Sequence, residues 1–369
     1  MRITFIAPCL YIGGGVKVMA IYARQLTRMG HRVRIVSQPP TAVAPLTKIK
    51  AWLGRGDSRP RARVDISGLD HRELDRCRPI TNSDVPEADV VIATWWETAE
   101  WVNFLDPEKG VKVYFIQHHE VFPYLPIERS KATYRMPFHK IVVSKWLKEL
   151  MSVEYDDGVV DLVPNSVDRS QFSAPVRGKQ RRPTVGFLYA TAPFKGLDIS
   201  LSAVSTLRRR MPNLRVICFG SEDPMSQLPD GMEFVFCPPQ AEIAKLYAEC
   251  DVWIAASRSE GFNLPAVEAM ACRTPIVSTR TGWPAEAVKT GWNGVLVEVD
   301  DLASFTDGIE WVLVRSEEEW RILSDNAYNT TLAGSWEYSA KLFERALEHA
   351  CQRSLRGEIL GKCQKSAIQ

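Results

Sequence analysis

Short apolar runs alternate with longer segments of helical periodicity along the chain. Near the N-terminus, an apolar run at residues 3–7 is followed by apolar side chains at helical spacing over residues 16–29. Gly30 suits the end of this helix. Further apolar runs predict strands at residues 33–36, 89–93, 112–116 and 140–143. Such alternation of strands and helices is typical of a parallel α/β sheet.

A second series of strands begins after a polar, basic stretch at residues 177–182. Its predicted strands cover residues 184–188, 215–219, 233–236, 251–255, 274–278 and 294–297. We therefore predict two α/β domains with a boundary near residues 165–182. A ligand is expected in the cleft between such domains, where strands end and helices begin. The polar residues after 352 predict a frayed end.

Composition narrows the class of protein. A chain of 369 residues gives each domain enough length to bury its own core, and a net charge of +2 gives no indication of a nucleic-acid partner. The eight cysteines form no Cys-x-x-Cys pair, which favours reduced thiols over a disulfide framework or a zinc site. Neither a signal peptide nor a membrane-spanning segment is predicted. We expect a cytoplasmic protein, with peripheral contact at the inner face of a membrane as an open alternative.

Between residues 41 and 65, lysines and arginines outnumber acidic residues. This stretch predicts a mobile loop that is either solvated or in contact with an anionic lipid or a charged acceptor.

Two glutamates flank a predicted helix start in the C-terminal half. Glu260 and Glu268 lie on either side of Asn263, a good N-cap, and Pro265, which suits a first helical turn; the helix is expected over about residues 264–272. A helix N-terminus favours phosphate, whereas an ionised glutamate only accepts hydrogen bonds and therefore suits hydroxyl groups. A diphosphate with hydroxyls at both ends satisfies both preferences. The alternative is a solvated helix start whose glutamates pair with lysines.

This segment resembles the signature of the retaining glycosyltransferases of sequence family 4, which have the GT-B fold. Gly-Phe follows Glu260, Glu268 opens Glu-Ala-Met-Ala, and residues 274–277, 282–286 and 291–297 also fit the family. The resemblance implies an α/β protein with two Rossmann-like domains facing across a cleft.

The same resemblance implies that the chain divides into three parts. Residues 1–165 would form the acceptor side, residues 166–335 the nucleotide-sugar side, and residues 336–351 a helix crossing back to the N-terminal domain.

The resemblance also implies roles for individual residues. Glu260 would meet the hydroxyls of the donor sugar and Glu268 the nucleotide ribose. Lys195, which precedes Gly196, matches the phosphate-binding lysine. Backbone N–H groups after the first glutamate would approach the sugar and diphosphate; they belong to Gly261, Phe262, Asn263 and Leu264.

Two departures from the family pattern concern the donor site. Asn263 stands where glycine is usual, although asparagine tolerates a left-handed φ. Ala190 stands where the family has an arginine, and Arg258 or Lys17 is our hypothesis for the replacement cation.

A run of glycines joins the first strand to the first helix. Gly14 and Gly15 let the backbone approach a ligand, and they resemble the family's donor-binding Gly-Gly loop. As a dinucleotide fingerprint the run lacks its third small residue, and no acidic residue ends the second strand. A dehydrogenase is therefore disfavoured.

Two histidines, His118 and His119, follow the strand at residues 112–116. They are either a surface pair or contacts to the sugar or acceptor hydroxyl, as a histidine near this point is in the family. Trp95 and Trp96 follow another strand and either stack on a sugar or pack in the core. The chain contains no Asp-x-Asp motif, so no metal is expected, and no cofactor beyond the nucleotide-diphosphate sugar that serves as donor substrate.

We thus predict a hexosyl- or deoxyhexosyltransferase that moves a sugar with retention from a nucleotide sugar to the hydroxyl of a glycan or lipid-linked glycan, in cell-surface polysaccharide or glycolipid assembly. The catalytic residues would be Glu260, Lys195, His118 and His119. A nucleotide-sugar epimerase of GT-B fold and a non-catalytic sugar-binding protein remain the alternatives.

Overall fold

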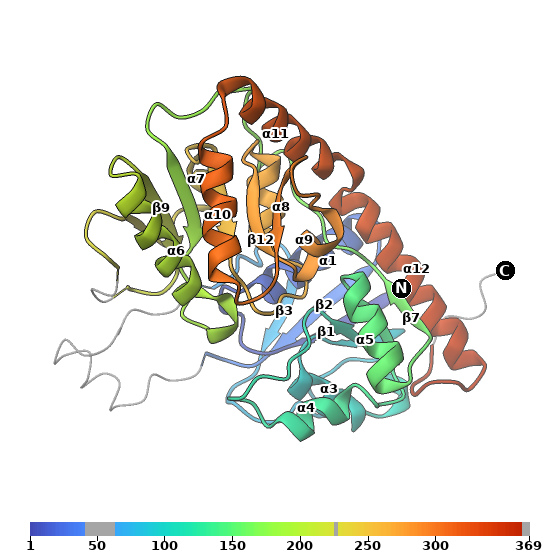
Figure 1. Ribbon diagram of the computed structural model, residues 1–369. Helices are drawn as coiled ribbons and strands as arrows, with labels where there is room; N and C mark the ends of the chain where they lie inside the picture. The colour runs from blue at the N-terminus through green and yellow to red at the C-terminus, as the bar shows by residue number, and fades with distance from the viewer. Residues whose placement is uncertain (41–62, 225–227, 364–369) are drawn as a thin grey trace. The chain divides into compact units, whose positions relative to one another are not determined.

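The structure is a computed structural model that describes residues 1–40, 63–224 and 228–363 (Figure 1). The chain divides into two compact units. Unit 1 contains residues 1–165 and the segment from Trp336 onward, and unit 2 contains Ser166–Ser335. The loop predicted at residues 41–65 lies outside the described residues as far as residue 62.

Unit 1 is built on a parallel seven-stranded sheet in the order β3-β2-β1-β4-β5-β6-β7. Its strands are β1 (Arg2–Ala7), β2 (Arg32–Ser37), β3 (Asp70–Glu73), β4 (Val90–Ala93), β5 (Val111–Ile116), β6 (His139–Val142) and β7 (Val160–Leu162). The sequence predicted all but β3 and β7. Strand β3 is polar and largely exposed, and β7 is only three residues long, so neither has an apolar run to reveal it.

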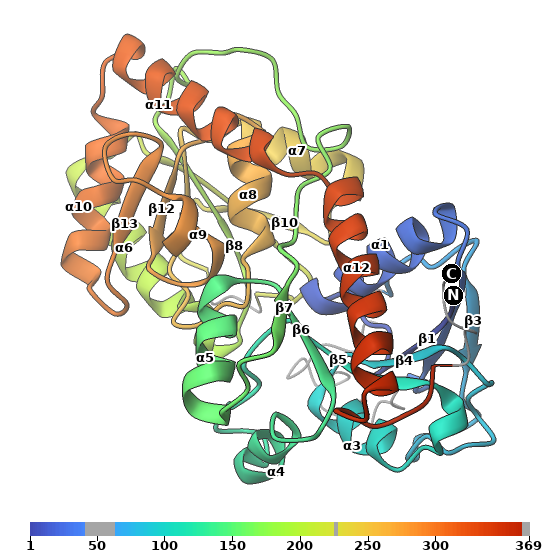
Figure 2. The same ribbon diagram turned by 90° about the vertical axis from the view of Figure 1, so that its right-hand side faces the viewer.

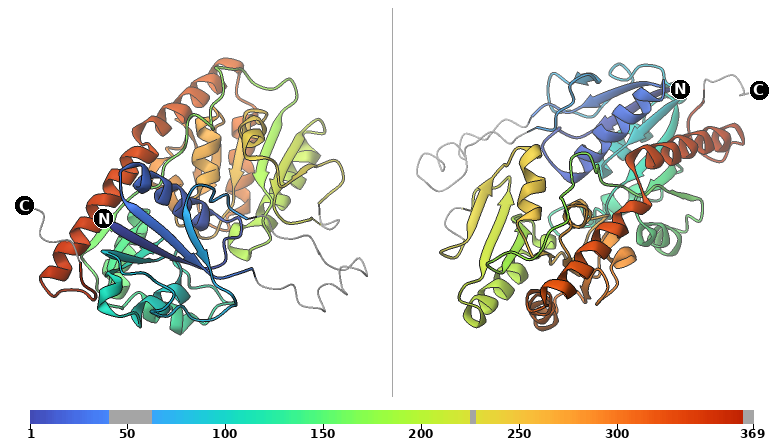
Figure 3. Two further views of the ribbon diagram at one scale, coloured as in Figure 1. Left: turned by 180° about the vertical axis from the view of Figure 1, so that it is seen from behind. Right: turned by 90° about the horizontal axis from the view of Figure 1, so that it is seen from above.

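Helices cover both faces of this sheet. They are α1 (Gly14–Arg28), α3 (Trp96–Asn103), α4 (Ile127–Thr133), α5 (Lys145–Tyr155) and α12 (Trp336–Leu355), with a 3-10 turn, η1, at Pro107–Lys109. Helices α1 and α12 lie side by side against the sheet (Figures 2 and 3). The right-handed crossovers place α3 and α5 on the opposite face.

Aromatic packing fixes α12 on unit 1. The Phe343 ring stacks on Tyr22 with centroids 4.5 Å apart and meets Phe115 edge-on at 5.0 Å. The prediction of a frayed end after residue 352 is wrong as far as residue 363. The Lys112 backbone N–H donates to the Leu360 carbonyl at 3.0 Å, and Ile359 is buried, so the polar segment docks through its backbone and one apolar side chain.

Unit 2 repeats the design with a parallel six-stranded sheet in the order β10-β9-β8-β11-β12-β13. Its strands are β8 (Thr184–Leu188), β9 (Arg215–Gly220), β10 (Glu233–Phe236), β11 (Val252–Ala255), β12 (Ile276–Thr279) and β13 (Gly294–Val297). Its helices are α6 (Leu197–Arg210), α7 (Gln240–Ala248), α8 (Leu264–Ala271), α9 (Gly282–Ala287), α10 (Leu302–Leu313) and α11 (Glu317–Thr330), with 3-10 turns η2 (Pro193–Lys195) and η3 (Thr331–Ala333). Helices α6 and α10 lie side by side on one face (Figure 1), and α7, α8 and α11 pack together on the other.

The two sheets confirm the prediction of two Rossmann-like α/β domains. In each, the strand order reverses at one point, between β1 and β4 in unit 1 and between β8 and β11 in unit 2. Loops that leave the carboxyl ends of strands at such a point diverge and leave room for a ligand. Within the described residues, no helix is both long enough and apolar enough to cross a membrane.

Candidate functional site

The reversal point of unit 2 brings together Lys195 and Glu260. Lys195 ends η2, which follows β8, and Glu260 lies in the loop after β11. The Lys195 Nζ donates to the Glu260 Oε1 at 2.7 Å, and the Ser257 Oγ donates to the same oxygen at 2.7 Å. Glu260 is only 6% exposed, so these two hydrogen bonds to its carboxylate are largely shielded from solvent. Opposite charges in such a setting interact more strongly than in water.

A glycine makes this close approach possible. Gly196 has φ +63°, and a Cβ added there would lie 2.0 Å from the Ala256 carbonyl oxygen. The turn after η2 therefore rests directly on the end of β11. The Arg258 backbone N–H donates to the Phe194 carbonyl at 2.7 Å and joins the same two loops. In the Lys-Gly pair, the lysine therefore supplies the charge, and the glycine allows the close approach to the Ala256 carbonyl.

The Arg258 side chain is engaged by acidic residues. Its guanidinium makes two hydrogen bonds to Asp198, of 2.9 and 2.7 Å, and one to Asp300, of 2.7 Å. It also donates to the Pro193 carbonyl at 2.9 Å. Arg258 therefore clamps η2 to the start of α6. Its charge is already matched by two carboxylates, which weakens the hypothesis that it replaces the arginine missing at Ala190. The other candidate, Lys17, lies in the first turn of α1 in unit 1.

Helix α8 begins as the sequence predicts. Asn263 is its N-cap, with φ +79°, and its side-chain Oδ1 accepts from the Ala266 N–H at 3.4 Å. The preceding Gly261–Phe262 segment is held by the Trp283 N–H, which donates to the Phe262 carbonyl at 2.7 Å. The Asn263 side-chain Nδ2 is buried and has no hydrogen-bond partner within the described part of the chain.

A cavity of about 20 Å³ lies between these loops. Its lining includes Leu188, Lys195, Ser200, Trp253, Ser257, Glu260, Asn263 and Pro265. This volume has room for about one water molecule. It marks the point where a lysine, a carboxylate and a helix N-terminus converge.

Glu268 lies further along α8 and does not line this cavity. It is buried, and its Oε2 accepts from the Tyr247 hydroxyl at 3.0 Å. Burial, and next the neighbouring Glu268 charge, raise the pKa of Tyr247 well above its usual value, so the tyrosine remains a donor. No motif in the sequence indicates a role for Tyr247, because it occupies an ordinary buried position of helix α7.

In unit 1, the glycine turn lies beside the segment that follows β5. Gly13 caps α1, and the Gln117 Nε2 donates to the Gly15 carbonyl at 3.0 Å. A Cβ on Gly15 would lie 3.4 Å from that same nitrogen. Gly15 thus contacts Gln117, the residue that precedes the two histidines.

The two histidines have different environments. The His119 Nε2 lies 2.7 Å from the Tyr155 hydroxyl, and burial lowers the pKa of His119 to about 4. His119 is therefore neutral near pH 7. The His118 Nδ1 donates to the His119 carbonyl at 3.0 Å, and its ring packs against Phe122 with centroids 5.0 Å apart.

Glu120 fixes this segment, and the sequence interpretation missed it. Its Oε2 accepts from the Trp96 N–H at 2.7 Å, its backbone N–H donates to the Tyr134 hydroxyl at 2.8 Å, and its carbonyl accepts from the Ser130 hydroxyl at 2.6 Å. Burial raises the pKa of Glu120 well above its usual value. Trp96 is itself buried, which favours core packing over sugar stacking for that ring.

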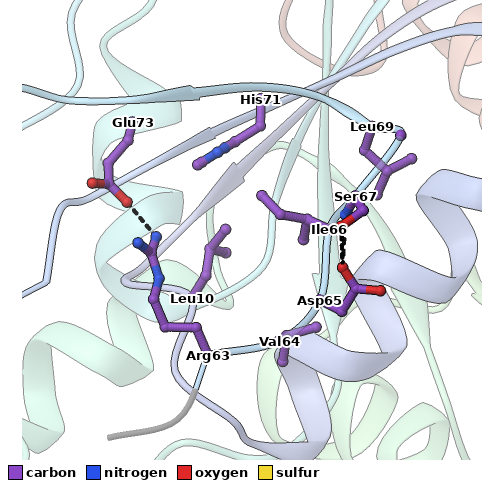
Figure 4. A pocket seen from close by; sticks show the side chains of 10 residues that line it. Leu10, Arg63, Val64, Asp65, Ile66, Ser67, Leu69, His71 and Glu73 are labelled. Atoms are coloured by element: carbon purple, nitrogen blue, oxygen red, sulfur yellow. Dashed lines mark hydrogen bonds and ion pairs between the residues drawn. The ribbon is translucent and has the colours of Figure 1, made fainter. Parts of the chain in front are cut away.

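A larger hollow, of about 620 Å³, opens beside β3 in unit 1 (Figure 4). Leu10 and residues 63–69 line it together with His71 and Glu73. Figure 4 shows the Arg63–Glu73 ion pair on one side and the hydrogen bond between Asp65 and Ser67 on the other.

Among the described residues, His139, Asp161 and His349 approach one another closely enough to ligate a metal. Both rings contact the Asp161 Oδ2, at 3.0 and 2.9 Å. The Arg353 guanidinium only donates, so the His139 Nδ1, 3.3 Å away, is the acceptor and its Nε2 carries the proton shared with Asp161. In the structure these hydrogen bonds join β6, β7 and α12. We therefore assign this cluster to anchoring α12.

Comparison with solved structures identifies the fold. Sucrose-phosphate synthase from Thermosynechococcus elongatus superposes with a TM-score of 0.71 at 16% identity, covering 97% of this chain and 100% of that chain. The Anabaena protein HepE in complex with UDP and glucose superposes with a TM-score of 0.70 at 16% identity, covering 95% and 100%. These likenesses confirm that the chain has the GT-B fold.

Sequence comparison finds similarity to glycosyltransferases in the C-terminal half of the chain. Residues 182–315 match the family model of glycosyl transferases group 1. The D-inositol 3-phosphate glycosyltransferase of Mycobacterium marinum is 33% identical over 218 residues, which are 52% of this chain and 45% of that protein. The same enzyme of Segniliparus rotundus is 30% identical over 164 residues, 39% of this chain and 36% of that protein. The matched region spans less than half of either relative. Over residues 182–315, the chain is similar to the group 1 glycosyl transferases.

Proposed function

We propose that this protein transfers a sugar from a nucleotide-diphosphate sugar to an acceptor hydroxyl, with retention of configuration. One observation carries the proposal: Lys195 and Glu260 meet at the reversal point of unit 2, beside the N-terminus of α8. A cation and helix N–H groups suit a diphosphate, and a carboxylate suits hydroxyls. Few ligands other than a nucleotide sugar combine these groups.

In this proposal Glu260 accepts hydrogen bonds from hydroxyls of the donor sugar, and Lys195 neutralises the diphosphate. On binding, the ligand contacts both members of the Lys195–Glu260 ion pair, and its diphosphate accepts hydrogen bonds from the lysine. Glu268, whose Oε2 accepts from the Tyr247 hydroxyl, binds the ribose. Gly14 and Gly15 contribute to donor binding, and His118 and His119 contact the sugar or the acceptor hydroxyl.

The chemistry that follows is a substitution on one face of the sugar. The acceptor oxygen forms a bond to the anomeric carbon while the bond from that carbon to the phosphate oxygen breaks. The departing phosphate oxygen takes the acceptor proton. Lys195 stabilises the negative charge that grows on the diphosphate, so its effect is larger in the transition state than in the ground state.

Similar proteins support this class of substrate. HepE of Anabaena has been solved in complex with UDP-glucose, and a variant of S. aureus TarM in complex with fondaparinux, α-GlcNAc-glycerol and UDP. We place the acceptor of this protein among glycans or lipid-linked glycans, in cell-surface polysaccharide or glycolipid assembly, with a hexose or deoxyhexose as the transferred sugar.

A ligand panel followed by product analysis tests the proposal. UDP-, GDP- and dTDP-sugars are screened for a rise in Tm, because a ligand that binds only the folded state stabilises it. The stabilising donor is then incubated with candidate acceptors, and the anomeric configuration of the product is read by NMR. Retention is expected. Inversion, or conversion of the donor without any acceptor, would contradict the proposal, and the latter would identify an epimerase.

A further inference from the structure

We propose that the Asn263 carboxamide binds the donor directly, with Nδ2 donating a hydrogen bond to the distal phosphate, the one bonded to the sugar. This inference rests on the proposed function and deepens it. The resemblance to the family concerns backbone N–H groups at this position; the side chain is a feature of this chain, because glycine is usual there.

The orientation of the carboxamide follows from its hydrogen bonds. Oδ1 accepts from the Ala266 N–H at 3.4 Å, as an N-cap does. An amide whose oxygen is engaged in this way presents its NH2 group on the other side. That group is buried, Asn263 is only 7% exposed, and no atom of the described residues accepts its hydrogens.

The surroundings of the amide indicate the ligand that it meets. Asn263 lines the same cavity as Lys195 and Glu260. In the proposed complex Glu260 holds the sugar and Lys195 holds the diphosphate. The Asn263 NH2 group, which lies beside both residues, would then face the phosphate that is bonded to the sugar. The N-terminus of α8 adds a positive potential at the same place, which favours an anionic oxygen as the acceptor.

Backbone conformation alone does not account for an asparagine here. The φ of +79° would be adopted by glycine without a side-chain penalty. An aspartate would cap the helix equally well, but it has no N–H group. A buried, unsatisfied donor is costly in the free protein, and a phosphate oxygen would remove that cost on binding.

Two substitutions distinguish phosphate binding from helix capping. N263D keeps the capping oxygen and replaces the NH2 group with a charged oxygen facing the phosphate. N263G keeps the backbone conformation but loses both the cap and the donor. If Nδ2 binds phosphate, N263D weakens binding more than N263G does. If the residue only caps α8, the order is reversed.

The experiment is calorimetric titration of the full chain with UDP, GDP and dTDP, with their sugars, and with the matching nucleoside monophosphates. For the nucleotide that the wild type binds, we expect the Kd of the diphosphate and of the nucleotide sugar to rise roughly tenfold to a hundredfold in N263D and several-fold in N263G. The monophosphate, which has no distal phosphate, should bind all three proteins alike. N213D, at an exposed asparagine of unit 2, is the matched control.

Three results would overturn the inference. They are an unchanged Kd in N263D, a larger loss in N263G than in N263D, and an equal loss for the monophosphate. If N263D fails to fold, the N263G titration still tests the inference. An unchanged Kd for the diphosphate in N263G would also contradict a hydrogen bond from Nδ2 to the distal phosphate. Failure of the proposed function looks different, because the wild type itself would then bind none of these nucleotides.

Discussion

Burial sets the protonation state of the histidine that faces the proposed acceptor side. The pKa of His119 falls to about 4 in the folded protein, against an unfolded value of about 6.5. A histidine in this state acts as a hydrogen-bond partner at neutral pH rather than as a cation. His119 therefore suits the orientation of a hydroxyl through its neighbour Tyr155, rather than the stabilisation of a negative charge.

The same shift makes stability depend on pH. Between about pH 6.5 and pH 4 the unfolded chain binds the proton and the folded protein does not, so this histidine's contribution is present above pH 6.5 and is lost as the pH falls. In H119Q, the free energy of unfolding should therefore decline less between pH 6.5 and pH 4 than in the wild type. Urea titrations at several pH values measure both slopes. Parallel slopes would show that His119 is not buried as the structure has it.

Single residues also mark the limit of the sequence interpretation. The cap at Asn263 and the glycine after Lys195 were predictable because they act on their own backbone neighbours. The partners of Arg258 were not predictable, since Asp198 and Asp300 lie far from it in sequence and no motif joins them. Glu120 was overlooked for a related reason: nothing in the sequence indicates that its carboxylate caps a helix that begins at Trp96.

At the scale of elements, the contact between the turn after η2 and the end of β11 sets the position of Lys195. G196A should lower the free energy of unfolding by roughly 2–5 kcal/mol, because a Cβ would meet the Ala256 oxygen and a positive φ is unfavourable for alanine. Denaturant unfolding measures this change. G158A is the control, since nothing lies within 4 Å of a Cβ there. Equal stability of both variants would contradict the close packing.

Strands were predictable where they are apolar and buried, which covers the centre of both sheets. They were not predictable at the edge formed by β3, whose residues Asp70–Glu73 carry polar side chains. That strand owes its existence to pairing with β2, which is a tertiary contact that a local pattern does not contain. The hollow beside β3 could therefore not be predicted from the sequence either.

At the scale of the whole molecule, the chain returns to unit 1 through α12 after completing unit 2. Phe343 is fully buried against Tyr22 and Phe115. F343A should destabilise unit 1 by about 3–5 kcal/mol through the cavity it leaves. Thermal unfolding and hydrogen exchange of strands β1 and β5 would detect the loss.

The control for this prediction is L355A, on the same helix but 69% exposed. It should change stability by less than about 0.5 kcal/mol. If both substitutions have the same small effect, α12 does not contribute to the core of unit 1. The fold was predictable at this scale because the signature around Glu260 is contiguous in sequence.

The most direct test of the account asks whether Lys195 binds the diphosphate of the donor and Glu260 binds its sugar. Binding of the nucleoside diphosphate and of the nucleotide sugar is measured by calorimetry for the wild type, K195A and E260Q. The account predicts that K195A weakens both ligands by roughly tenfold or more, whereas E260Q weakens only the nucleotide sugar, because its carboxamide replaces an acceptor that sugar hydroxyls need. Wild-type affinity of both variants for both ligands would contradict it.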